Sequence, residues 1–182
     1  LDELVTRCPD ITEVLISLHG DSKTHVGVTK IKDSYNRIVK FIEKYSQLES
    51  DQLPILIRIN VVVTGDNLNN EFYDLLKSYI KKGIQINLLP LNFWSDASGQ
   101  TITKEQYKKI YDSINWFTYT LDKELKGTTW KSLLKRNQKY KDIHGANLLN
   151  IRYAEICRLD KSSFPYSVSH YEHFFDKKDW NK

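Results

Sequence analysis

Residues 55–64 read Ile-Leu-Ile-Arg-Ile-Asn-Val-Val-Val-Thr, and this stretch decides the fold. Successive side chains in a β-strand point to opposite faces. As a strand, the stretch places only apolar residues on one face: Ile55, Ile57, Ile59, Val61 and Val63. Its other face mixes apolar and polar residues, among them Arg58, Asn60, Val62 and Thr64. We therefore predict one face that packs against helices and a second face that contacts a polar group.

Two further stretches repeat this pattern, residues 14–20 (VLISLHG) and residues 84–91 (IQINLLPL). In residues 14–20, Ser17 and His19 fall on the face opposite the apolar one. In residues 84–91, Gln85 falls on the face opposite the apolar one. A parallel strand that helices cover on both sides would be apolar on both faces. The pattern is typical of strands that line a ligand cavity.

Helical patterns separate these strands. Apolar residues recur at helical spacing over residues 35–45 and again over residues 72–80. Gly83 follows two lysines, which predicts a helix end. Residues 103–106 have capping-box spacing and begin a third amphipathic helix. Strands that alternate with helices of this length predict parallel pairing through right-handed crossovers, with ligands at the carboxyl ends of the strands.

The predicted fold class is therefore α/β, with parallel strands alternating with helices in a partial (β/α) TIM-like barrel. Residues 1–125 would form three β/α units. Residues 126–182 are basic and aromatic, and we expect an irregular C-terminal extension that packs on the half barrel.

Composition limits the function classes. The chain has 182 residues, a net charge of +4 and an isoelectric point near 8.9, with 40% hydrophobic and 27% charged residues. These values are ordinary for a globular protein, and no apolar run is long enough for a membrane span. Two distant cysteines and no visible signal peptide predict a cytoplasmic location. Because the chain contains no methionine, we expect a piece of a longer protein or a sequence whose beginning is not included.

The three strands resemble a known family when taken in order. Residues 13–20 (EVLISLHG), followed by Thr24-His25 and a helix, resemble the fourth strand and following helix of radical S-adenosylmethionine enzymes. Residues 58–67 (RINVVVTGDN) resemble the fifth strand, and residues 85–92 (QINLLPLN) the sixth. The resemblance covers about residues 10–125, the carboxyl-terminal half of a six-stranded partial barrel.

The resemblance implies contacts to S-adenosylmethionine from the fourth and fifth strands. Ser17 and His19 would approach the ribose or methionyl part of this cofactor. Asn60 would hydrogen-bond its polar groups, and Val62 would lie beside the adenine. Arg58 lies deeper on the same face and would meet a carboxylate.

On the sixth strand the resemblance places Leu89, Pro90 and Leu91 against the adenine ring. The chain departs from the family because it lacks the C-x-x-x-C-x-x-C loop, whose three thiolates hold a 4Fe–4S cluster. Its two cysteines cannot replace that loop. The resemblance therefore implies a partner, the amino-terminal half of the same barrel, that carries the cluster ligands. It assigns no catalytic residue here, no metal ligand and no particular substrate, which could be a small molecule or a peptide.

Other interpretations remain open. Arg58 could form an internal salt bridge, Ser17 could be a packed hydroxyl, and His25 is expected to order the loop after the first strand. The alternative function is a non-enzymatic α/β module that binds a nucleotide or a small anion. Nucleic-acid binding by the basic, aromatic C-terminal segment is less favoured, because the lysines lie mostly on outer faces of the predicted helices.

Overall fold

The computed structural model of the chain describes residues 3, 7–8, 13–45, 56–91, 103–124, 135, 137–139, 141–142, 148–153 and 170–173. For residues 104, 150–153 and 170–173 it describes the backbone alone. The predicted domain boundary at residue 125 lies outside the described residues.

A five-stranded sheet organises the described part of the chain, with the strands in the order β1-β2-β3-β4-β5. Its strands are β1 (Glu13–Ser17), β2 (Leu56–Val63), β3 (Gln85–Pro90), β4 (Leu149–Tyr153) and β5 (His170–His173). The pairs from β1 to β4 are parallel, which the sequence predicts for β1, β2 and β3, whereas β5 runs antiparallel to β4. The fold class α/β is confirmed.

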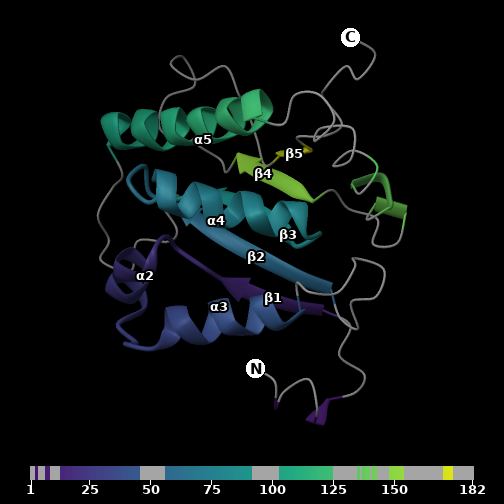
Figure 1. Cartoon of the computed structure of the whole chain (residues 1–182). Helices are drawn as coiled ribbons and strands as arrows, with labels where there is room; N and C mark the ends of the chain where they lie inside the picture. Colours follow the sequence, from purple (N-terminus) through teal and green to yellow (C-terminus); the bar gives the residue numbers. More distant parts are fainter. Residues whose placement is uncertain are drawn as a thin grey trace.

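The helices follow from the strand order. Helices α3 (Ser34–Tyr45), α4 (Asn70–Lys81) and α5 (Lys104–Glu124) connect successive strands of the sheet. Because right-handed crossovers between strands in chain order return on the same side, the three helices should cover one face. Figure 1 shows α3, α4 and α5 together in front of the sheet. The opposite face, called the second face below, carries the polar residues.

The core lies between this sheet and these helices. The apolar face of β2 is fully buried at Ile57, Ile59, Val61 and Val63. Large side chains of α4 and α5, such as Phe117, pack in the same hydrophobic cluster. Burial of these β-branched and aromatic side chains, at roughly 1.5–3 kcal/mol each, is the main stabilising contribution.

The helix boundaries follow the predicted signals. Thr103 and Gln106 form the expected capping box, since the Thr103 backbone N–H donates to Gln106 Oε1 at 2.7 Å. The Gln106 backbone N–H donates back to Thr103 Oγ1 at 3.3 Å. Gly83, at φ 88°, ends α4 in the left-handed region that favours glycine.

Two features differ from expectation. A short helix, α2 (Ser22–Thr29), replaces the predicted loop after β1. The region expected to be an irregular C-terminal extension adds two strands, β4 and β5, to the main sheet. These strands have only five and four residues, too short for a clear period-two pattern.

Candidate functional site

A row of polar residues crosses the second face of the sheet. Ser17 of β1 is in register with Asn60 of β2, and Asn60 is in register with Asn87 of β3. The register then continues to Asn150 of β4. Side chains of register partners in neighbouring parallel strands share a face, so Ser17, Asn60 and Asn87 form one polar row.

The side chains of Asn60 and Asn87 are joined directly. The Asn87 amide Nδ2 donates a hydrogen bond to Asn60 Oδ1 at 2.9 Å. Asn87 is 8% exposed and Asn60 is half-buried. The middle of the polar row therefore has a defined geometry.

An apolar row lies next to the polar one, one step nearer the carboxyl ends of the strands. Val62 and Leu89 are register partners on the same face as Asn60 and Asn87. Both side chains are half-buried. The second face thus combines hydrogen-bonding groups with an adjacent apolar surface of two side chains, which suits a ligand with a polar part and a flat apolar part.

Arg58 lies on the same face of β2, two residues before Asn60 and so farther from the carboxyl end of the strand. Its Nε atom is 3.2 Å from Glu13 Oε1, so the internal ion pair that the sequence left open is present. The Nε–H does not point at the carboxylate well enough for a hydrogen bond. The side chains of Arg58 and Glu13 are 30% and 40% exposed, and such partly exposed pairs contribute little stability. The pair leaves Arg58 available to a second acceptor.

The exposed fraction of the side chains on the second face decreases from β1 to β3. Leu15 of β1 is 57% exposed, and its neighbours Glu13 and Ser17 are also exposed. Gln85 of β3, in contrast, is 1% exposed. The accessible part of this face is therefore centred on β1 and β2.

His19 follows β1 and is held from both sides through its backbone. Its N–H donates to Nδ1 of His25 on α2 at 3.2 Å, and its carbonyl accepts from Asn67 Nδ2 at 2.9 Å. The rings of His19 and His25 are stacked, with centroids 5.8 Å apart. Burial lowers the pKa of both histidines, and the nearby His19 lowers that of His25 further. The neutral form of both imidazoles is therefore favoured.

Asn67 ties the loops that follow β1 and β2. Besides the His19 carbonyl, its Nδ2 reaches the Val62 carbonyl at 2.7 Å, and its Oδ1 accepts from the Thr64 backbone N–H at 2.9 Å. Asn67 is 1% exposed, so these bonds satisfy groups that water does not reach. The carboxyl ends of the two strands are therefore fixed relative to each other.

The first turns of α2 and α4 are joined as well. Asp21 caps α2 by accepting from the Thr24 backbone N–H, and Asn69 caps α4 by accepting from the Phe72 backbone N–H. Asn69 Nδ2 also donates to Asp21 Oδ2 at 2.7 Å. Hydrogen bonds from Thr24 and Asn69 lower the pKa of the Asp21 carboxyl.

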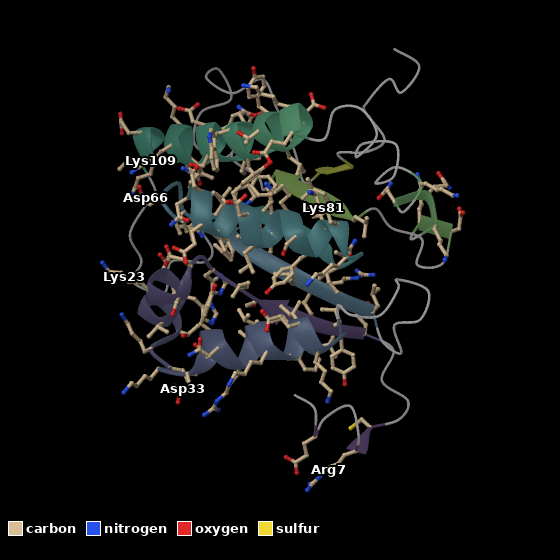
Figure 2. All side chains as sticks on the ribbon, viewed as in Figure 1. Arg7, Lys23, Asp33, Asp66, Lys81 and Lys109 are labelled. Carbon is tan, nitrogen blue, oxygen red and sulfur yellow. The ribbon has the colours of Figure 1, made fainter. Side chains whose placement is uncertain are left out.

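The loop after β2 also contacts α5. Asp66 forms an ion pair with Lys109, and the two side chains lie side by side in Figure 2. Ser113 Oγ donates to the Gly65 carbonyl at 2.7 Å. A Cβ on Gly65 would lie 2.9 Å from Lys109 Cγ and 3.2 Å from the Ile110 backbone nitrogen. The loop that frames the candidate site is thus packed against a helix.

The structure brings together part of the predicted site. Ser17, Asn60, Val62 and Leu89 lie on the same second face of the sheet, and Arg58 lies on it as well. Pro90 does not join them, because it is in register with Val63 on the helix-covered face.

The two remaining predicted residues lie outside the polar and apolar rows. His19 lies beyond the end of β1, stacked on His25. Leu91 follows the end of β3 and packs against the hydrophobic core. Leu91 lies one residue past the end of β3, where strand alternation no longer sets the side-chain direction.

Sequence reasoning did not assign a site role to Asn87, Asn67 or His25. Asn87 has a recognisable signal, since it alternates onto the same face as Gln85 and Leu89. Asn67 has none, because its contact with His19 links residues 48 positions apart. His25 was expected to order its loop, and it does so through a helix and a backbone hydrogen bond.

Comparison with known proteins gives no family: no protein-family model, curated protein or solved structure matches the chain. Within the described residues, no group of three or more His, Cys, Asp or Glu side chains could hold a metal ion. None of the helices in the described part is long and apolar enough to cross a lipid bilayer. The basic C-terminal segment considered for nucleic-acid binding lies mostly outside the described residues.

Proposed function

We propose that the chain is the carboxyl-terminal part of a radical S-adenosylmethionine enzyme and that the second face of β1–β3 binds S-adenosylmethionine. The observation that carries this proposal is the polar row of Ser17 and Asn60 beside the apolar row of Val62 and Leu89. The apolar row offers a surface to the adenine ring. The polar row offers donors to the ribose or methionyl oxygens, and Arg58 lies beyond it for a carboxylate.

The order of the strands supports the proposal that the fold is a partial TIM-like barrel. Four parallel strands follow chain order, and the connecting helices cover one face. A doubly wound sheet would reverse its strand order and place helices on both faces. A barrel keeps one order, encloses the second face and binds ligands at the carboxyl ends of its strands.

The residues of this chain fit the adenosyl ligand but not the iron–sulfur cluster. The two cysteines fall short of the three thiolates that the family uses, and Cys8 is exposed. The cluster would therefore be held by another segment, which we propose to be the amino-terminal half of the same barrel. Within the described sheet, β1 is an edge strand, so its outer edge is the place where that half would continue the sheet.

The test uses the intact protein, purified without oxygen. We expect iron, acid-labile sulfide and reductant-dependent release of 5′-deoxyadenosine, with a small molecule or a peptide as the substrate. Asn60→Leu should weaken S-adenosylmethionine binding in calorimetry, because it removes the central donor of the polar row. Lys123→Gln, on the outer surface of α5, is a matched control that should leave binding unchanged. Absence of both iron and S-adenosylmethionine binding would refute the proposal.

A second candidate is a non-enzymatic α/β module that binds a nucleotide or small anion. The observation that favours it is the absence of a thiolate triplet, together with Arg58, whose ion pair is partly exposed. This candidate predicts calorimetric binding of adenosine nucleotides to a protein that contains no iron. Iron content therefore separates the two candidates even when both bind an adenosyl ligand.

A further inference from the structure

The contact between Asn60 and Asn87 has a direction. A carboxamide has one oxygen that accepts hydrogen bonds and one NH2 group that donates two. Asn87 Nδ2 is the donor in this contact and Asn60 Oδ1 is the acceptor, at 2.9 Å. The oxygen of Asn60 is thus engaged by a buried neighbour, and its own NH2 group is directed elsewhere.

The NH2 group of Asn60 has no hydrogen-bond partner in the described part of the chain. Asn60 is half-buried between Ser17 and Asn87, in the middle of the polar row. Nδ2 of Asn60 is not one of the fully buried atoms that lack a partner, so water can reach it. An acceptor atom of a ligand can take the place of that water and accept the hydrogen bond.

We propose that Asn87 is a positioning residue that fixes the side-chain amide of Asn60 with its NH2 group toward the ligand, so that the site selects an acceptor atom at this point. The inference rests on the proposed adenosyl-binding function for the identity of the ligand. An adenosyl compound supplies such acceptors as ring nitrogens and ribose oxygens. Asn87 need not touch the ligand to set this preference.

Substitutions at Asn87 distinguish a reversed Asn60 amide from an Asn60 amide that has only lost its hydrogen-bond partner. In Asn87→Asp the carboxylate only accepts, so Asn60 must donate to it and turn its oxygen toward the ligand. In Asn87→Leu the amide of Asn60 is released but can still donate. We expect the affinity for S-adenosylmethionine to fall by about tenfold or more in Asn87→Asp and by a smaller factor in Asn87→Leu. Asn60→Asp should match Asn87→Asp.

Adenosine serves as a neutral second probe that controls for the charge of the new carboxylate. Reorientation of the Asn60 amide should lower the affinity for both adenosine and S-adenosylmethionine. A purely electrostatic effect of the new carboxylate would change the affinity for S-adenosylmethionine alone. The free energy of unfolding of each variant, from urea titrations, accounts for any loss of folded protein. Equal losses in Asn87→Leu and Asn87→Asp, or a loss confined to the charged probe, would overturn the inference.

Nuclear magnetic resonance of the ligand-free protein tests the orientation independently of any ligand. We expect a scalar coupling across the hydrogen bond from the Asn87 NH2 group to the Asn60 side-chain carbonyl carbon. A coupling in the opposite direction would refute the inference. If the expected coupling is present and neither probe binds, the orientation stands and the adenosyl-binding function fails.

Discussion

The backbone N–H of His19 donates to Nδ1 of His25, and the two rings stack at 5.8 Å. Since Nδ1 of His25 accepts, the neutral ring carries its proton on Nε2. That atom is buried without a hydrogen-bond partner in the part of the chain that the structure describes. Protonation of His25 would remove the acceptor and place a charge beside His19.

This arrangement predicts a pH dependence of stability. Both histidines have a folded pKa below the ordinary value of 6.5, so the unfolded chain binds protons first as the pH falls. The free energy of unfolding should therefore be fully retained above pH 6.5 and decrease between pH 6.5 and the lower folded pKa values. Urea titrations at closely spaced pH values test this, and His25→Asn should show a shallower decrease. Stability that rises as the pH falls from 7 to 5 would contradict the assignment.

A pair of substitutions at His25 tests its hydrogen bond separately from its charge. His25→Leu removes the acceptor for the His19 N–H, and we expect a loss of about 1–3 kcal/mol in the free energy of unfolding. His25→Asn keeps an acceptor near the same place and should lose less. Equal losses measured by urea denaturation would show that the hydrogen bond is unimportant.

Asn67→Ala should destabilise the protein more than Asn69→Ala. Asn67 makes buried hydrogen bonds to both strand ends, and its removal leaves two carbonyls and one N–H without a partner, at a cost of at least about 2 kcal/mol. Loss of the Asn69 cap should cost about 1 kcal/mol. Thermal and urea unfolding measure both, and the reverse order would argue against Asn67 as the link between strand ends.

Two glycine substitutions should change the free energy of unfolding in opposite directions. Gly65→Ala places a Cβ against Lys109 and Ile110 at a φ of 94°, and it should destabilise by about 1–3 kcal/mol. Gly27→Ala meets nothing within 4 Å on α2 and should stabilise by about 0.5–1 kcal/mol. Denaturant midpoints of the two variants check the contrast. Stabilisation by Gly65→Ala would mean that the loop does not pack on α5 as described.

Substitutions in the ion pair of Arg58 and Glu13 distinguish a structural role from a ligand-binding one. Because the pair is partly exposed, Glu13→Gln should change stability by less than about 1 kcal/mol. If Arg58 also meets an anionic group, Arg58→Met should weaken binding of a carboxylate or phosphate ligand, and Glu13→Gln should strengthen it. Calorimetry that finds no change in either variant would leave Arg58 with the structural role alone.

Much of the fold was predictable from local patterns. The alternation around Asn60 predicts which face of β2 packs on helices, and the capping-box spacing at Thr103 predicts the start of α5. Helix α2 was not predictable in this way, because its sequence contains β-branched residues and Gly27, which have low helix propensity. Its stability comes from contacts of His25 with His19 and Tyr35 and from the Asp21 cap. The capping carboxylate is in turn held by Asn69, which lies 48 positions away in sequence.

In the candidate site, too, features set by local sequence were predictable and features set by distant residues were not. Alternation predicts that Ser17, Asn60, Val62 and Leu89 share a face, because strand periodicity is local. It does not predict that Asn87 orients Asn60, because that bond depends on the register between two strands. Pro90 does not share this face, because it is in register with Val63, and its contact with the adenine rests on the resemblance alone.

The position of β1 at one end of the described sheet has a consequence for handling the protein. A border strand that carries an exposed leucine, Leu15, can recruit the same strand of a neighbouring molecule through backbone hydrogen bonds. The chain on its own should therefore show concentration-dependent light scattering. Leu15→Lys should suppress that scattering without unfolding the monomer.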